Sequence, residues 1–150
     1  MEKYDSAVDT QAHIEQVERL IQIFTKELHN RAIYHDCSKL QPPEKEIFDE
    51  YSPKLKNVTY GSDEYKQYLS EMQVALTHHY ANNAHHPEFH NEGIAGMTLL
   101  DLVEMLCDWK AATMRHADGN ILNSIEINQG RFGYSDELKS IFINTIQIFN

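Results

Sequence analysis

The sequence predicts an all-α fold of about six helices. Apolar residues recur at three- and four-residue steps in most segments, residues that favour helix starts precede several of them, and no stretch of useful length shows the two-residue alternation of a β-strand. The length of 150 residues fits one domain, and 41% hydrophobic against 24% charged residues is ordinary for a globular chain. We therefore expect a single helical bundle over residues 1–150, which helices within 119–150 complete.

The first helix is expected over residues 10–28. Its apolar stripe consists of Ile14, Val17, Leu20, Ile21, Phe24 and Leu28. His13 lies one turn before Val17 on the same side of this helix. Its imidazole is therefore expected to point toward the core.

Prolines and a serine divide the next part of the chain. Pro42-Pro43 ends a short segment over residues 31–38 and begins a new helix, which Pro53 ends or bends. Ser62 is followed by two acidic residues, which complement a helix dipole. Another helix is therefore expected to begin there.

A long loop and the most apolar helix follow. The apolar stripe of the preceding helix ends at His79, which is expected to face inward. Residues 81–97 lack a period, and loops of such length are usually functional or disordered. Thr98 and Asp101 resemble a capping box at the start of a helix that continues to about Arg115. This helix is expected to run through the centre of the fold.

Three carboxylates, those of Asp101, Glu104 and Asp108, share one stripe of this central helix within an arc of roughly 60°. Capping of the helix explains Asp101 best, whereas either a basic partner or a functional site explains Glu104. Two further helices are expected, one around residues 121–127 and one after Ser135. The apolar face of the last helix either closes the core or forms the seam of a homodimer.

Charge and hydropathy exclude several classes of protein. With 13 Lys and Arg against 23 Asp and Glu, the formal charge is −10, so the surface repels nucleic acid and anionic membranes. No run approaches the ~18 apolar residues of a membrane span, and the N-terminus lacks the pattern of a signal peptide. We expect a cytoplasmic protein. Cys37 and Cys107 match no disulfide or zinc motif and are expected to be reduced and buried.

Histidine stands out in the composition, because five of nine copies lie within 13 residues: His78, His79, His85, His86 and His90. The adjacent His35 and Asp36, the inward-facing His13 and the carboxylate of Asp108 add further donors. Imidazole nitrogen and carboxylate oxygen together suit Mn, Fe, Co, Ni or Zn, whereas Mg and Ca prefer oxygen alone. The sequence therefore predicts a transition-metal site.

The arrangement of these residues resembles a known superfamily. His13, HDCSK at 35–39, the histidine-rich stretch 78–90 and CDWKA at 107–111 resemble the HD-domain metal-dependent phosphohydrolases, in particular a small bacterial and phage branch. The resemblance covers most of residues 10–118. It implies an HD-like helical bundle that binds one or two divalent ions.

The resemblance also implies roles for individual residues. Residues from the beginning and the end of the matched region would bind a first metal, and histidines between them would bind a second. Asp101 and Glu104 stay open as alternatives to Asp108 as the last ligand of the first metal. The implied metal ligands are His13, His35, Asp36 and Asp108 for the first ion, and His79 with His85 or His86 for the second. The implied catalytic residues are Asp36, Lys39 and Glu104, with Lys39 near a substrate phosphate or else a solvated surface lysine.

The function expected from this site is hydrolysis of a nucleotide or similar small phosphate ester by a metal-activated water. A short chain favours a small phosphorylated metabolite over a polymer as substrate. Two rivals stay open: a di-iron oxygenase on the same scaffold, and a noncatalytic metal- or nucleotide-binding protein.

Overall fold

The computed structural model describes residues 4–59, 62–115 and 117–149. Within these ranges the chain forms seven α-helices and four short 3₁₀ helices, and no strand. The all-α prediction is confirmed. The chain divides into two compact units, Met1–Tyr34 and His35–Asn150.

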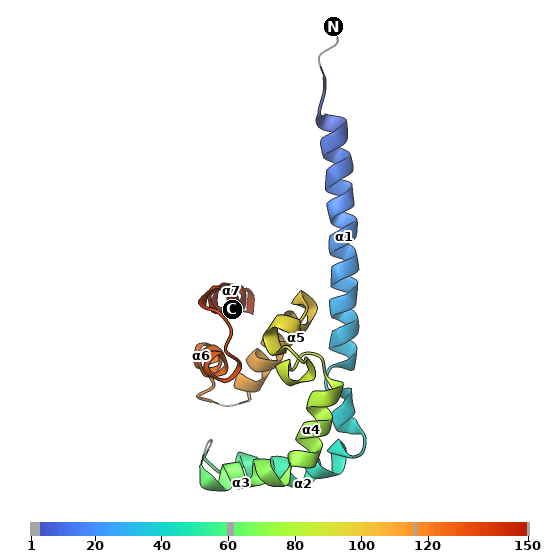
Figure 1. The fold of residues 1–150 in the computed structure, drawn as a ribbon. Helices are drawn as coiled ribbons and strands as arrows, with labels where there is room; N and C mark the ends of the chain where they lie inside the picture. The colour runs from blue at the N-terminus through green and yellow to red at the C-terminus, as the bar shows by residue number, and fades with distance from the viewer. Residues whose placement is uncertain (1–3, 60–61, 116, 150) are drawn as a thin grey trace. The chain divides into compact units, whose positions relative to one another are not determined.

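The first unit contains one long helix, α1 (Ala7–Tyr34), drawn in blue in Figure 1. It extends beyond the predicted 10–28 and includes the start of the segment expected over 31–38. None of its residues is buried, because the unit offers no second element to pack against. The side chain of His13 is therefore exposed in this unit.

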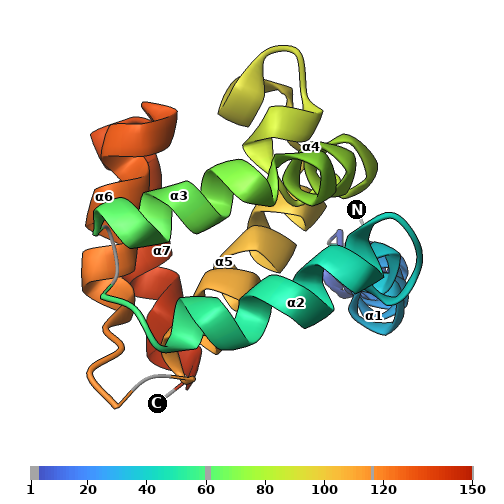
Figure 2. The same ribbon diagram turned by 90° about the horizontal axis from the view of Figure 1, so that it is seen from below.

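The second unit begins with a 3₁₀ helix, η1 (Cys37–Leu40), and three α-helices: α2 (Glu44–Lys56), α3 (Asp63–Glu71) and α4 (Gln73–Asn82). α2 and α3 lie side by side (Figure 2). Ser62 caps α3 as predicted, with its hydroxyl accepting from the Tyr65 amide. Pro53 lies inside α2, which continues for one more turn. The single helix expected up to His79 is divided at Met72, whose buried side chain marks the junction of α3 and α4.

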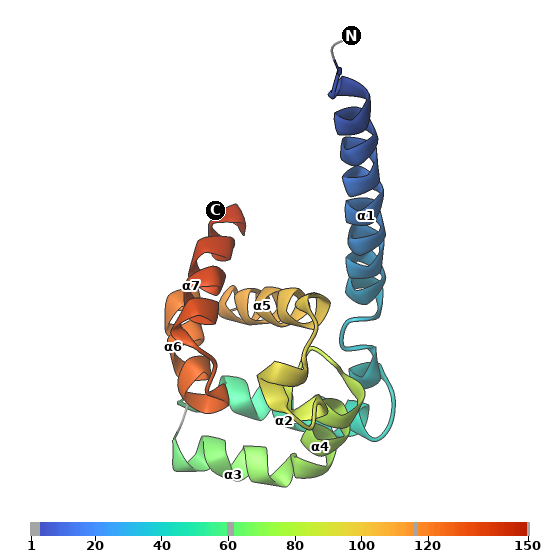
Figure 3. The same ribbon diagram turned by 45° about the horizontal axis from the view of Figure 1, so that its top comes forward.

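The rest of this unit holds η2 (Pro87–Phe89), η3 (Gly93–Gly96), α5 (Leu99–Thr113), α6 (Ile121–Phe132), α7 (Asp136–Thr145) and η4 (Ile146–Phe149). The predicted capping box is present: Thr98 Oγ1 accepts from the Asp101 amide, and Asp101 Oδ2 accepts from the Thr98 amide. Ser135 caps α7 as predicted. α6 and α7 pack together beside α5 (Figure 3).

The apolar core gathers around α5. Its buried members are Met105, Leu106, Ile125, Tyr134, Phe142 and Ile146. The last helix therefore closes the core through Phe142, one of the two roles expected for it. The Trp109 indole lies edge-on to the Phe142 ring, with centroids 5.8 Å apart. α5 thus runs along the core, as its apolar sequence predicts.

Two further expectations concern the surface. Neither Cys37 nor Cys107 forms a disulfide, but both are exposed, which corrects the expected burial. Cys37 lies in the first turn of η1, where a short helix covers little of it, and Cys107 lies beside Leu106 on the side of α5 that faces out. None of the described helices is long and apolar enough to cross a membrane.

Candidate metal centre

Two overlapping groups of metal-ligating side chains lie in the second unit. The first group contains Asp36, His79, His85 and His86, and the second contains His35, His85 and Asp108. Within each group the ligand atoms lie within 4.8 Å of one another. Six of the seven predicted metal ligands are therefore brought together.

The backbone brings these residues to one place from four segments. His35 and Asp36 follow directly on the end of α1, and Asp36 adopts a left-handed conformation with φ of 55°. This conformation is unfavourable for most residues other than Gly, Asn and Asp, and it bends the chain between the helix end and η1. The bend lets the adjacent imidazole and carboxylate face the same region.

The other ligands come from α4, the following loop and α5. His79 lies in the last turn of α4 and is almost fully buried. His85 and His86 follow in the turn before η2, with their rings 4.2 Å apart. Asp108 lies on α5. The long loop predicted over 81–97 thus supplies two ligands, and it is structured by η2 and η3.

The spacing of the first group fits a transition metal. Bonds of 2.0–2.2 Å hold neighbouring ligand atoms about 3.0 Å apart around an octahedral ion and about 3.4 Å apart around a tetrahedral one. Asp36 Oδ1 lies 3.2 Å from His79 Nε2 and 3.4 Å from His85 Nε2. His79 Nε2 lies 3.0 Å from His86 Nε2. All three separations fall in or near this range.

The ligand atoms of the second group lie farther apart than those of the first. His35 Nε2 lies 3.6 Å from Asp108 Oδ1, and His85 Nε2 lies 4.0 Å from Asp108 Oδ2. His35 Nε2 is also 3.6 Å from Asp36 Oδ2, the carboxylate oxygen that the first group does not use. The two groups therefore share His85, and Asp36 turns its second carboxylate oxygen toward His35 of the second group.

Two buried atoms at the centre of the first group make no hydrogen bond. They are Asp36 Oδ1 and His85 Nε2. Leaving a buried polar atom without a partner costs on the order of 1–3 kcal/mol, so such atoms need an explanation. A cation between them would provide the missing partner for both. The residues present thus fit a divalent transition metal.

Glu104 orients ligands of both groups. Its Oε1 accepts from His35 Nδ1 at 2.9 Å and lies 3.1 Å from His85 Nδ1. A carboxylate on Nδ1 fixes the proton there and leaves Nε2 with a free electron pair for a metal. Glu104 therefore contacts the outer sides of the two histidines.

Glu44 does the same for His79 and was not anticipated from the sequence. It is completely buried, and its Oε2 accepts from His79 Nδ1 at 2.9 Å. His78 Nδ1 and Ser38 Oγ donate to it as well, and Asn83 donates to the Ser38 hydroxyl. Although burial raises the pKa of Glu44, the hydrogen bonds from His78 and Ser38 lower it below its ordinary value. In the sequence Glu44 looks like an ordinary acidic residue in the first turn of a helix.

The surroundings shift the pKa values of two histidines in opposite directions. Asp108 and Glu104 raise the pKa of His35 to about 10, so without a bound cation this imidazole is protonated at neutral pH. Burial, together with His85 and His79, lowers the pKa of His86 to about 3 and keeps it neutral, as a ligand must be.

The two aspartates are kept ionised. Burial alone raises the pKa of Asp36, but His79 and Lys39 outweigh it and hold the pKa well below the ordinary value. In Asp108 burial is likewise outweighed by His35, and the pKa is lowered. Both side chains are therefore available as anionic ligands at neutral pH.

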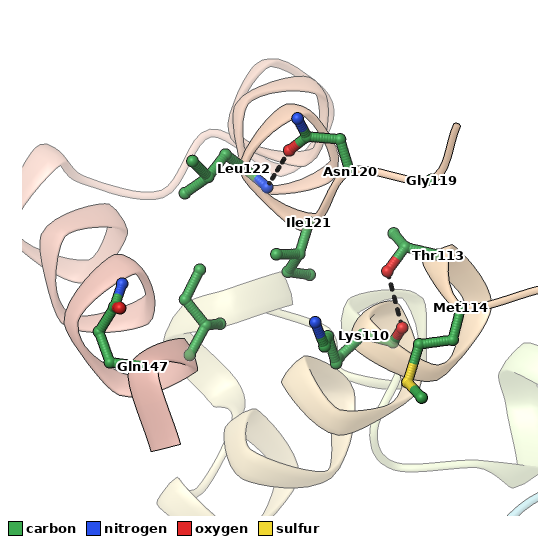
Figure 4. A pocket seen from close by; sticks show the side chains of 9 residues that line it. Lys110, Thr113, Met114, Gly119, Asn120, Ile121, Leu122 and Gln147 are labelled. Carbon is green, nitrogen blue, oxygen red and sulfur yellow. Dashed lines mark hydrogen bonds between the residues drawn. The ribbon is translucent and has the colours of Figure 1, made fainter. Parts of the chain in front are cut away.

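Two cavities of the described structure have no residue of this centre in their walls. One of about 380 Å³ lies between the end of α5 and the start of α6, with Lys110, Thr113 and Ile121 in its wall (Figure 4). Lys110 follows Asp108 by two residues, which places the two side chains roughly 160° apart around the helix. This cavity therefore lies on the opposite side of α5 from Asp108.

The sequence matches a family described as being of unknown function, DUF5662, over residues 2–148. The chain belongs to the DUF5662 family. Comparison with curated proteins and with solved structures gives no match.

In this DUF5662 protein, four further residues that the sequence pointed to lie outside both ligand groups. His13 belongs to neither ligand group, and its role as a ligand stays a prediction. Asp101 caps α5, so it is explained without a metal. His90, the last histidine of the cluster, has a largely buried side chain whose Nε2 donates to the Ala84 carbonyl at 2.8 Å. Lys39 lies beside Asp36, with Nζ 2.7 Å from Oδ2.

Proposed function

We propose that this protein is a metal-dependent phosphohydrolase that acts on a nucleotide or a similar small phosphate ester. The observation that carries the proposal is the pair of ligand groups that share His85, with two buried atoms, Asp36 Oδ1 and His85 Nε2, that lack hydrogen-bond partners. The HD-domain resemblance of the sequence supports the same class of reaction. A divalent transition metal in such a site lowers the pKa of its water to about 7 and stabilises charge on a phosphoryl oxygen.

The residues of the chain have separate tasks in this proposal. Asp36 and the three histidines of the first group bind the ion. Glu44 holds the Nδ1 proton of His79 and Glu104 that of His85, so that the Nε2 atoms of both rings face the centre. Glu104 is therefore a positioning residue in this proposal, in place of the catalytic role that the resemblance implies.

Lys39 supplies positive charge at the same place. Its ammonium group is partly exposed and lies against Asp36, so a phosphate oxygen that approaches the centre meets a cation. This contact offsets the repulsion that an anionic substrate meets from a chain of net charge −10. It favours a small substrate with one exposed phosphate.

The test compares two aspartates that each pair with a lysine. Asp36→Asn removes the ligand charge, whereas Asp49→Asn removes an exposed carboxylate that pairs with Lys45 at 2.6 Å. We expect the parent and Asp49→Asn to retain about one equivalent of Mn, Fe, Co, Ni or Zn and to release phosphate from nucleotides or simple phosphate esters. Asp36→Asn should lose both properties while its circular dichroism spectrum stays helical.

Other outcomes distinguish the rivals. Bound iron with oxygen consumption and no phosphate release would favour the di-iron oxygenase. Retained metal with neither activity would favour a noncatalytic binding protein. If a folded parent takes up none of these metals, the proposal is wrong.

A further inference from the structure

We propose that Lys39 takes the place of a second metal ion, so that this protein binds one divalent transition metal tightly and a second one only weakly. The inference rests on the proposed metal centre and goes beyond it, because the two ligand groups alone would suggest two equivalent ions.

His85 can serve only one of the two groups. Its Nδ1 faces Glu104 at 3.1 Å, which leaves Nε2 as the single nitrogen with a free electron pair. Nε2 lies 3.4 Å from Asp36 Oδ1 but 4.0 Å from Asp108 Oδ2. The shorter distance assigns His85 to the first group, where His79 and His86 complete a compact set.

The second group then depends on Asp36. Without His85 it retains His35 and Asp108, and among the described residues Asp36 Oδ2 offers a third donor, 3.6 Å from His35 Nε2. Two amino-acid ligands rarely suffice for a structural or catalytic metal site, which generally has three or four. A second ion therefore requires this carboxylate oxygen.

Lys39 already forms an ion pair with that oxygen. Its Nζ lies 2.7 Å from Asp36 Oδ2, the distance of a charge-assisted hydrogen bond. The lysine is held there by two further contacts: its amide donates to the Asp36 carbonyl at 2.9 Å across the turn of η1, and its Nζ lies 5.1 Å from the centre of the Phe48 ring. A second cation at Oδ2 would have to displace or approach this ammonium group.

The test measures metal stoichiometry in lysine variants. Lys39→Met removes the charge but keeps the length of the side chain, and Lys39→Arg keeps the charge. Lys45→Met is the matched control, since Lys45 forms a similar pair with Asp49 at 2.6 Å on the exposed face of α2. Each protein is titrated with Mn²⁺ by equilibrium dialysis, and the bound metal is counted by plasma mass spectrometry.

We expect one tight equivalent of Mn²⁺ in the parent, Lys45→Met and Lys39→Arg. Lys39→Met should bind a second equivalent with at least tenfold higher affinity than the parent does. Lys39→Gln repeats the test if Lys39→Met is not folded by circular dichroism.

Three outcomes would overturn the inference. Two equally tight ions in the parent, or a single ion in both neutral variants, would contradict the role of Lys39 while leaving the metal centre itself intact. An absence of bound metal in every protein would instead refute the proposed function, and the inference with it.

Discussion

Removing the Glu104 carboxylate should weaken metal binding without removing any metal ligand. Its Oε1 lies 2.9 Å from His35 Nδ1 and 3.1 Å from His85 Nδ1, on the sides of the rings opposite to the ligand atoms. In Glu104→Ala both Nδ1 atoms lose this acceptor. The rings can then turn, and His85 is no longer held in the tautomer that has its proton on Nδ1 and an electron pair on Nε2 for the metal.

The magnitude follows from the number of ligands affected. Loss of one outer hydrogen-bond partner typically lowers metal affinity about 10–100-fold. His85 belongs to the tight site and His35 to the weak one, so Glu104→Ala should lower the affinity for the first metal by about 10–100-fold. Glu104→Gln keeps a neutral oxygen acceptor, and a neutral hydrogen bond is roughly half as strong as a charge-assisted one. Glu104→Gln should therefore lower the affinity for the first metal only about 3–10-fold.

The assay is a competition between the protein and a chelator of known affinity for Zn²⁺. Glu50→Gln is the matched control, because Glu50 is an exposed carboxylate that pairs with Lys54 at 2.7 Å and lies on α2 outside the centre. Thermal unfolding followed by circular dichroism shows whether each variant is folded before the titration.

The decisive result is the order of affinities: parent and Glu50→Gln highest, Glu104→Gln lower and Glu104→Ala lowest. Unchanged metal affinity in Glu104→Ala would refute the positioning role. If Glu104→Gln kept full metal affinity but lost phosphate release, Glu104 would have the catalytic role that the resemblance implies.

Three further predictions concern stability. Thr98→Ala removes the hydroxyl of the capping box and should cost about 1 kcal/mol of unfolding free energy in urea titrations, and a change near zero would contradict the importance of the cap. Met105→Ala empties a site that is 1% exposed and should cost about 2–5 kcal/mol in the same assay; a loss under 1 kcal/mol would mean that the core collapses around it. After removal of metal with a chelator, the unfolding free energy should be highest near pH 6.5. It should fall toward acid because the pKa of His86 is lowered to about 3, and fall toward pH 10 because that of His35 is raised to about 10. In His86→Ala the fall toward acid should be shallower, and an equally steep fall would contradict this assignment.

Local chemistry was readable from the sequence. The helix starts at Ser62, Thr98 and Ser135 were predicted because a cap depends only on residues within one turn of it. The division of one expected helix at Met72 was missed, since apolar spacing continues through it and the break is decided by burial of that side chain.

The candidate site was predicted only in part, because the sequence shows which donors are present but not how they are arranged in space. The sequence by itself determined the donors: an adjacent histidine and aspartate, a cluster of histidines and a carboxylate on an apolar helix. Only the tertiary structure decided how they divide, because Asp36 turns one oxygen toward His79 and the other toward Lys39 through a backbone bend that no spacing reveals. Glu44 was invisible in the sequence for the same reason: its contact with His79 joins residues 35 positions apart, and contacts of that range depend on packing rather than on local pattern.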